Sequence, residues 1–307
     1  MDINRNNMNE LFTSFNMLFA KGLANAPHEY EKYSTIITSS TASTVYPYLE
    51  QFGRMREWIG DRQKRNIASG KIEVFNRDFE DTVVVPRNDI EDDQYALYGT
   101  LIQMLGQNAA QLWGDLAVEA LLGGDEKKWA DELPFFNAGR KYGEDSVINN
   151  LGTAALSAES YAEARSAMLS YRGHDGKALR VRPSLLIVGP SNEGRANDIL
   201  KASSRLVAST VANGENTEII SGSIQNTWAG TARILIEPDL GSEWFLADTT
   251  GPLKPVVVQK RKEVKLTRMD HETDDNVFMA KEYIYGTDAR GEAFLSFPHL
   301  IYGAFPA

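Results

Sequence analysis

A long apolar stripe in the middle of the chain sets the strongest limit on its fold. Apolar and aromatic side chains recur there at steps of three and four residues, the spacing of one helix face: Tyr95, Tyr98, Leu101, Ile102, Leu105, Leu112, Leu116 and Leu121. Gly123 and Gly124 follow and indicate where the helix ends. A helix over 92–123 has about 30 residues and a length of roughly 45 Å, far more than an ordinary globular helix.

Four carboxylates stand just before this helix, at Asp89, Glu91, Asp92 and Asp93. They raise the alternatives of a metal site, an acid/base pair, or a purely structural role. Acids at a helix N-terminus accept the free backbone N–H groups and complement the helix dipole. Neither a histidine nor a further carboxylate is spaced to complete a metal or catalytic site. We therefore predict that Asp92 and Asp93 cap the helix.

The composition excludes several classes of function. The chain has 307 residues, a net charge of −10 and no cysteine. An acidic chain is not expected to grip nucleic acid, which requires concentrated lysine and arginine. The lack of cysteine excludes disulfides and thiolate catalysis. No apolar run approaches the roughly 20 residues that span a bilayer, and the N-terminus lacks a signal-peptide pattern, so we expect a soluble intracellular protein.

Two segments near the N-terminus look built to contact something other than their own domain. Residues 8–24 have the spacing of an amphipathic helix, followed by a polar Ser/Thr-rich stretch, which suggests an arm that docks elsewhere. Residues 51–88 look like a long two-stranded hairpin that turns at 68–71 and carries few apolar residues. Such a ribbon is marginal in water unless one face is covered, and a neighbouring subunit is the economical cover. We expect this contact to use Trp58, Arg62, Arg65, Lys71 and Phe75.

The remainder of the chain mixes strands and helices with little alternation. We predict a helix after Ser157 as its N-cap, a buried strand at 185–188, a helix with Ala196, Ile199 and Leu200 inward, and a long exposed loop at 207–229. Further strands are expected in TARILIEP, EWFLAD and KPVVVQKRKEVKL, and a hairpin that turns across 286–288. This order is typical of an α+β fold.

Known catalytic signatures are missing from the sequence. It contains neither G-x-x-x-x-G-K-[ST], nor G-x-G-x-x-G, G-x-S-x-G or H-E-x-x-H. The acidic run 269–276 has some capacity for a divalent cation, but such a run more often forms a solvated loop. We therefore assign no catalytic, metal or cofactor-binding residue, and we expect no cofactor.

Several segments, in order, resemble the major head subunit of Mu-like transposable phages. They are ITSSTASTVYPYL, REWIGDR, FEDTVVVPRNDIEDDQ, PFFNAGRKYG, RPSLLIVGPSNEGRA, WFLADTTGPLKPVVVQKRK and DDNVFMAKEYIYGTDARGEAFLSFPHLIYGA. The resemblance covers most of the chain and includes no catalytic motif. It implies the tailed-phage major capsid protein fold of the Hong Kong ninety-seven type.

On that fold, the resemblance implies an N-terminal arm at 1–50 and an extended loop at 51–86. A peripheral domain is implied at 87–180 and 254–307, with its spine helix at 92–123, and an axial domain at 181–253. The loop 207–229 is then expected near the capsomer centre.

The implied function is structural and not enzymatic. The chain would form the pentamers and hexamers of an icosahedral head that encloses double-stranded DNA, after assembly in the bacterial cytoplasm. Implied partners are other copies of the chain, a scaffolding or protease protein, a portal and a decoration protein. The segment before the hairpin is too short for a scaffolding domain, so scaffolding is expected from a separate protein. Two alternatives stay open: a bacterial nanocompartment shell, and an oligomeric enzyme with its site at 89–93 or 270–275.

Overall fold

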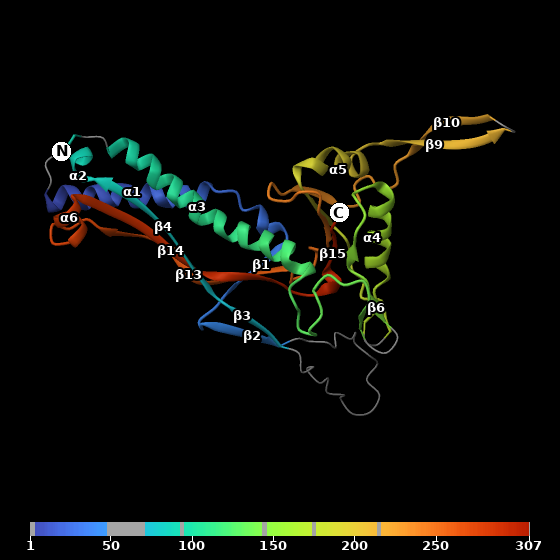
Figure 1. Cartoon of the computed structure of the whole chain (residues 1–307), viewed down its shortest axis with the longest axis horizontal. Helices are drawn as coiled ribbons and strands as arrows, with labels where there is room; N and C mark the ends of the chain where they lie inside the picture. Colours follow the sequence, from blue (N-terminus) through green and yellow to red (C-terminus); the bar gives the residue numbers. More distant parts are fainter. Residues whose placement is uncertain are drawn as a thin grey trace, which may run out of the picture. The chain divides into compact units, whose positions relative to one another are not determined.

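The structure, a computed structural model, describes residues 4–47, 71–92, 95–142, 146–173, 176–213 and 216–306 (Figure 1). Backbone contacts divide the chain into two compact units. Unit 1 takes its described residues from Met1–Tyr46, Glu73–Leu121 and Val256–Phe294. Unit 2 takes them from Pro47–Ile72, Leu122–Pro255 and Leu295–Ala307.

Unit 1 contains a four-stranded sheet with the strand order β1-β13-β14-β4. Its strands are β1 (Ser34–Thr38), β13 (Val256–Met269), β14 (Glu282–Leu295) and β4 (Arg77–Pro86). β1 runs parallel to β13, and β14 runs antiparallel to β4. A short helix, α6 (Asp275–Ala280), lies between β13 and β14 in the chain. The sheet mixes parallel and antiparallel pairs and is accompanied by helices, as the α+β prediction requires.

Three further helices and one 3₁₀ helix also belong to the described part of unit 1. They are α1 (Arg5–Asn25), η1 (Glu29–Lys32), α2 (Arg87–Glu91) and α3 (Tyr95–Leu122). The side chain of Asn4 caps α1 by accepting the backbone N–H of Asn7 at 2.9 Å. The predicted long helix is therefore present, as 28 residues of α3. None of the helices in the described ranges is both long and apolar enough to cross a membrane.

Glycine lets the backbones of α1 and α3 touch, and Figure 1 shows the two helices running alongside each other. A Cβ atom on Gly22 would lie 2.1 Å from the carbonyl oxygen of Gln103. A Cβ on Gly106 would lie 2.3 Å from the carbonyl oxygen of Phe19. Only glycine avoids these clashes at this helix separation. The two helices are thus packed more closely than larger residues would allow.

The core of unit 1 lies between these helices and the sheet. Phe15 and Phe19 of α1, Ile102 of α3 and Tyr285 of β14 belong to one buried cluster. The rings of Phe15 and Tyr285 meet edge to face with 5.1 Å between centroids. The helix predicted at 8–24 exists, but it buries its apolar face on its own unit. The expectation that this helix docks elsewhere was wrong.

A five-stranded sheet organises unit 2, in the order β11-β8-β12-β15-β7. Its strands are β11 (Arg233–Ile236), β8 (Leu185–Val188), β12 (Trp244–Ala247), β15 (Ile301–Ala304) and β7 (Leu151–Gly152). All four residues of β8 and of β12 are buried, as continuous apolar strands require. Further elements of this unit are η2 (Gly123–Asp125), β5 (Arg140–Lys141), β6 (Val147–Ile148), α4 (Ala158–Ser170), η3 (Pro190–Asn192), α5 (Glu193–Leu200) and η4 (Pro298–Leu300).

Several sequence predictions for this region are confirmed. Ser157 caps α4, and its hydroxyl accepts the backbone N–H of Ser160 at 3.1 Å. The strand at 185–188 has the predicted bounds. Ala196, Ile199 and Leu200 are the buried residues of α5. Capping residues and short apolar runs were therefore sufficient signals here.

Three other predictions differ from the structure. The segment predicted as a loop at 207–229 contains the hairpin β9 (Ser204–Asn213) and β10 (Asn216–Gln225), joined through an unbroken antiparallel register. β14 continues straight through 286–288, where a turn was expected, because these residues pair with 80–82 of β4 in an unbroken antiparallel register. Residues 77–86 are an edge strand of the unit 1 sheet and not half of a free ribbon.

Candidate functional site

The elements nearest the predicted hairpin form the best candidate for an assembly site. β2 (Ser43–Pro47) and β3 (Lys71–Phe75) pair in a two-stranded sheet, which we call the β2–β3 ribbon. A single residue, Asn76, separates β3 from β4. The ribbon is therefore joined directly to the edge of the unit 1 sheet.

A polar network centred on one buried glutamine holds the base of this ribbon. The side chain of Gln259, on β13, is fully buried. Its amide oxygen accepts the hydroxyl of Tyr46 at 2.5 Å, and its amide nitrogen donates to the side-chain oxygen of Asn76 at 2.6 Å. The amide of Asn76 in turn donates to the carbonyl oxygens of Thr41 and Ala42 at 3.0 and 3.2 Å. These hydrogen bonds connect both strands of the ribbon region to the buried side chain of Gln259 and anchor its base to the sheet.

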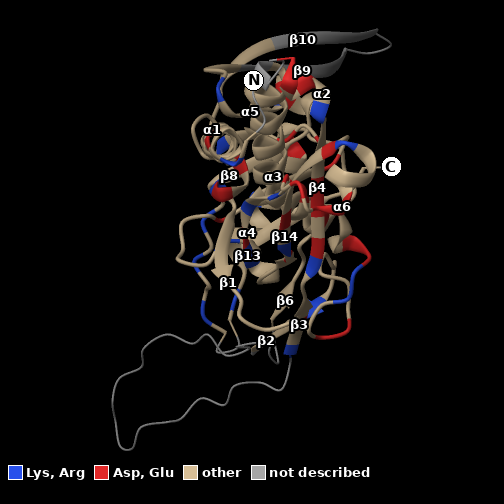
Figure 2. Ribbon diagram, turned by 90° about the vertical axis from the view of Figure 1, so that its left-hand side faces the viewer, with Lys and Arg blue, Asp and Glu red and all other residues tan. Residues whose placement is uncertain are grey.

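Arg77 adds an ionic clamp just beyond Asn76. Its guanidinium bonds both carboxylate oxygens of Glu292 on β14, at 2.6 and 3.0 Å, and a carboxylate oxygen of Glu119 on α3, at 2.7 Å. The hydrogen bonds that Arg77 donates, first to Glu292 and then to Glu119, raise the pKa of Arg77 further above its ordinary value. The fork of a guanidinium suits this bidentate contact. Figure 2 shows the charged residues of both signs along β4.

Of the residues predicted to contact a neighbouring subunit, two can be placed. Lys71 and Phe75 lie at the two ends of β3 and are exposed, with 64% of Phe75 accessible. Trp58, Arg62 and Arg65 lie outside the described residues, so their contacts stay a prediction. An exposed phenylalanine on a well-anchored ribbon is consistent with a contact surface.

The acids before α3 are engaged in local structure. Asp89 accepts the hydroxyl of Tyr98, and this bond first, then burial, raises the pKa of Tyr98. Glu91 pairs with Arg87 at 3.0 Å. Asp92 ends α2, where its backbone N–H donates to the carbonyl oxygen of Asn88.

Helix α3 begins at Tyr95, and Asp93 lies outside the described residues. The predicted capping of α3 by Asp92 and Asp93 therefore stays a prediction.

The second acidic run does not assemble a cation site either. Asp270 is buried beside Arg268 and accepts the hydroxyl of Tyr285 at 3.2 Å, and burial raises the pKa of Asp270. Asp274 accepts the backbone N–H of His271 at 2.9 Å. Within the described ranges, no group of three or more histidine and carboxylate side chains is arranged to hold a metal ion.

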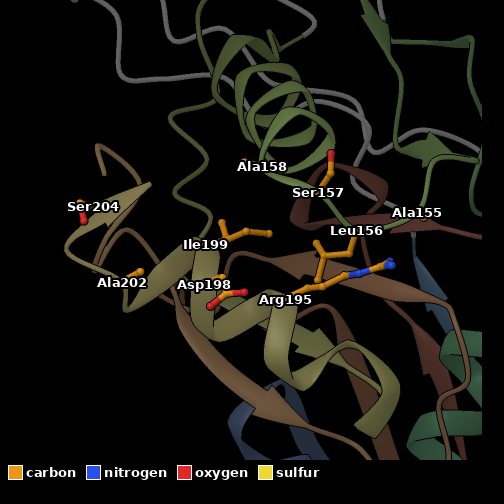
Figure 3. A pocket seen from close by; sticks show the side chains of 9 residues that line it. All are labelled: Ala155, Leu156, Ser157, Ala158, Arg195, Asp198, Ile199, Ala202 and Ser204. Atoms are coloured by element: carbon orange, nitrogen blue, oxygen red, sulfur yellow. The ribbon is translucent and has the colours of Figure 1, made fainter. Parts of the chain in front are cut away.

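A groove in unit 2 lies between α4 and α5 and has a volume of about 670 Å³ (Figure 3). Its lining is mainly small and apolar, with Arg195 and Asp198 as its charged side chains. The hydroxyl of Ser157 lines it but is committed to the cap of α4. The groove brings together no nucleophile with a base, so it offers no catalytic constellation.

Sequence reasoning missed the network at the base of the ribbon. A weak signal was present: Gln259 directly follows the apolar run Val256–Val258, so a polar side chain is expected next to a buried strand segment. Its partners, Tyr46 and Asn76, are distant in sequence, so their meeting depends on the sheet register.

Comparison with known sequences identifies a family for the whole chain. A family model described as the Mu-like prophage major head subunit gpT matches residues 8–154, 149–240 and 226–305. The Mu-like prophage FluMu major head subunit of Haemophilus influenzae is 26% identical over 300 residues, covering 97% of this chain and 73% of that protein. The major capsid protein of Escherichia phage Mu is 24% identical over 287 residues, covering 94% of this chain and 70% of that protein.

Solved structures share the fold. A chain of the bacteriophage JBD30 procapsid is 27% identical, with a TM-score of 0.61, over 99% of this chain and 77% of that chain. A chain of the JBD30 capsid decorated with minor capsid protein trimers is 23% identical, with a TM-score of 0.56, over 71% of this chain and 93% of that chain.

Proposed function

The chain belongs to the family of Mu-like prophage major head subunits, and we infer from this membership which of its surfaces take part in forming a phage head. The chain is the major capsid protein that forms the icosahedral capsid of the virion, with the fold of tailed-phage capsid proteins. The observation that carries this conclusion is the family match, which runs from residue 8 to residue 305. The match favours a phage head over the nanocompartment shell and the oligomeric enzyme.

We infer that the chain assembles through rings of five and six copies. A closed icosahedral shell of one repeated protein needs fivefold vertices and quasi-sixfold faces, and heterologous contacts close into such rings. Mass photometry and negative-stain microscopy of the chain, alone and with its scaffolding partner, test this. Rings, tubes or closed shells are expected. A compact monomer under every condition would contradict it.

The β2–β3 ribbon is proposed as a contact with a neighbouring copy. Its anchored base and the exposed Phe75 and Lys71 support this role, and Trp58, Arg62 and Arg65 are proposed to extend the same contact. Phe75→Ala is expected to leave the folded subunit unchanged and to weaken assembly. Leu169→Ala, at another exposed apolar side chain on α4, is the matched control. Equal assembly of the two variants would remove Phe75 from the interface.

The domain assignment follows the same proposal. The arm is proposed at 1–50, the extended loop at 51–86 with β4 (77–86) as its base in the unit 1 sheet, the peripheral domain at 87–180 and 254–307, and the axial domain at 181–253. The hairpin β9–β10, within the proposed axial domain, is the candidate element near the capsomer centre.

Further partners are proposed: a scaffolding or protease protein, a portal, and a decoration protein. The similarity to a procapsid chain supports the first, and the similarity to a decorated capsid supports the last. A portal is required for DNA to enter a closed shell. We propose assembly in the host cytoplasm, no enzymatic activity, and no sequence-specific contact with the enclosed double-stranded DNA, which the net charge of −10 supports. Co-purification of the named partners with shells tests these proposals.

A further inference from the structure

Helix α6 presents two large apolar side chains to solvent. Phe278 is 80% exposed and its neighbour Met279 is 81% exposed. Scattered single apolar residues on a surface are ordinary, but two adjacent large side chains exposed to this degree are not. We call this pair the α6 knob.

The knob stands on a rigidly held support. Val277, the preceding residue, is buried in the unit 1 core. The side-chain amide of Asn276 donates to the carbonyl oxygens of Met269 at 3.0 Å and Glu282 at 2.7 Å, which ties the end of β13 to the start of β14. These contacts hold the first half of α6 on unit 1, while Phe278 and Met279 extend into solvent.

A concave surface with apolar and polar lining lies elsewhere in unit 1, between α1 and α3. We call it the α1–α3 groove; it is lined by Leu11, Ser14, Phe15, Leu18, Gly99, Thr100 and Gln103 and has a volume of about 280 Å³. A cavity of about 150 Å³ is sufficient for benzene, so the groove has room for one aromatic ring. Gly99 leaves room for the side chain of Leu18, whose Cδ1 a Cβ atom at Gly99 would approach to 2.9 Å.

The solvent face of α3 beside this groove has the composition of an interface. Residues 95–114 contain no aspartate, glutamate, lysine, arginine or histidine. Leu97, Leu101 and Met104 recur at helical spacing and are exposed, Leu97 by 62%. The depletion of charge together with exposed apolar side chains is typical of the core of a protein–protein interface.

We propose that the α6 knob of one copy inserts into the α1–α3 groove of a neighbouring copy. The proposal rests on the shell assembly described above, because a shell brings many identical chains into contact. Each copy carries one knob and one groove, the equal supply that a heterologous contact within a ring requires. Charge also fits: Glu272, Asp274 and Asp275 precede the knob, and the α3 face that would receive it carries no acid to repel them.

Disulfide trapping tests the contact directly, because the natural chain contains no cysteine. The double variant Met279→Cys with Thr100→Cys is assembled and oxidised. Thr100 lines the groove, so disulfide-linked ladders of chains are expected under non-reducing conditions. The control is Met279→Cys with Gln111→Cys, which uses an exposed position further along α3 and is expected to give no ladder. Equal linkage in both variants, or none in either, would overturn the proposal.

A second variant measures the contribution of the knob to assembly. Phe278→Ser with Met279→Ser alters exposed side chains only, so the thermal unfolding of the subunit is expected to stay unchanged. The concentration needed for half-maximal assembly is expected to rise at least about tenfold, as for the loss of a central apolar anchor. Shells that form normally from this variant but fail to bind a decoration protein would assign the knob to that protein and overturn the proposal.

The wild-type chain, run in parallel, separates this inference from the function on which it rests. If the wild type assembles and the variants behave like it, only the knob contact is refuted. If the wild type forms no ring or shell with its scaffolding partner, the proposed assembly fails and the knob contact fails with it.

Discussion

Replacing Gly106 by alanine is expected to force α1 and α3 apart. The new Cβ would lie 2.3 Å from the carbonyl oxygen of Phe19, so the helices must separate by about 1 Å to reach an ordinary contact. A backbone carbonyl cannot rotate away as a side chain can. We expect an overpacking cost of about 3 kcal/mol, at the upper end of the usual range. Alanine recovers about 1 kcal/mol of helix propensity, which leaves a net destabilisation of about 2 kcal/mol.

Gly114→Ala is the matched control in the same helix. A Cβ at Gly114 has only Tyr30 within reach, at the ordinary distance of 3.7 Å. This variant is expected to gain about 1 kcal/mol from propensity alone. Urea unfolding followed by circular dichroism is expected to separate the two midpoints by roughly 1 M, from typical urea slopes. Hydrogen exchange in α1 then assigns the change to that helix. Equal midpoints for the two variants would refute the close packing of α1 on α3.

Three further predictions concern single side chains. Arg77→Lys is expected to lose the bidentate contact with Glu292. Because this ion pair is partly exposed, the loss is expected to destabilise the subunit by less than about 1 kcal/mol. The difference from wild type in urea unfolding is expected to shrink at high salt, which screens exposed charges. Burial lowers the pKa of His299 to about 4 in the folded chain. The unfolded chain, with a pKa near 6.5, therefore binds a proton first, and the folded state loses stability as pH falls from 6.5 toward 4. His299→Gln is expected to reduce this loss, measured as urea midpoints from pH 7.5 to pH 4. The buried amide of Asn226 donates to the carbonyl oxygens of Ile199 and Ala202 at 2.9 and 2.8 Å. Asn226→Ala leaves both carbonyls without this donor and is expected to lower the free energy of unfolding by about 2 kcal/mol. An unchanged midpoint of thermal unfolding would contradict this.

Local patterns were sufficient to predict most of the helices and the buried strands. The stripe along α3, the Ser157 cap of α4 and the apolar run of β8 each depend on residues close together in the chain. The fold class followed from their order, and the resemblance to Mu-like head subunits supplied the architecture. These signals depend on neighbouring residues, and the tertiary contacts of the folded chain agree with them.

The errors arose where a long-range partner decides the outcome. Polar composition suggested a loop at 207–229, but β9 and β10 complete each other's backbone hydrogen bonds. Gly286 suggested a turn, but it lies within the continuous pairing of β14 with β4. Similarly, the network of Tyr46, Asn76 and Gln259 is assembled by strand register, which no short stretch of sequence encodes.

The close packing of α1 on α3 has a mechanical consequence for a shell that must contain tightly packed DNA. Two rods that slide past each other bend almost independently, whereas two rods joined along their length bend as one thicker beam. The close backbone contacts at Gly22 and Gly106 oppose sliding, because a shift of one helix along the other would press a backbone carbonyl group into the facing helix. Pressure on the shell is therefore expected to tilt α1 and α3 together, so that strain appears at the contacts between subunits before it appears inside unit 1.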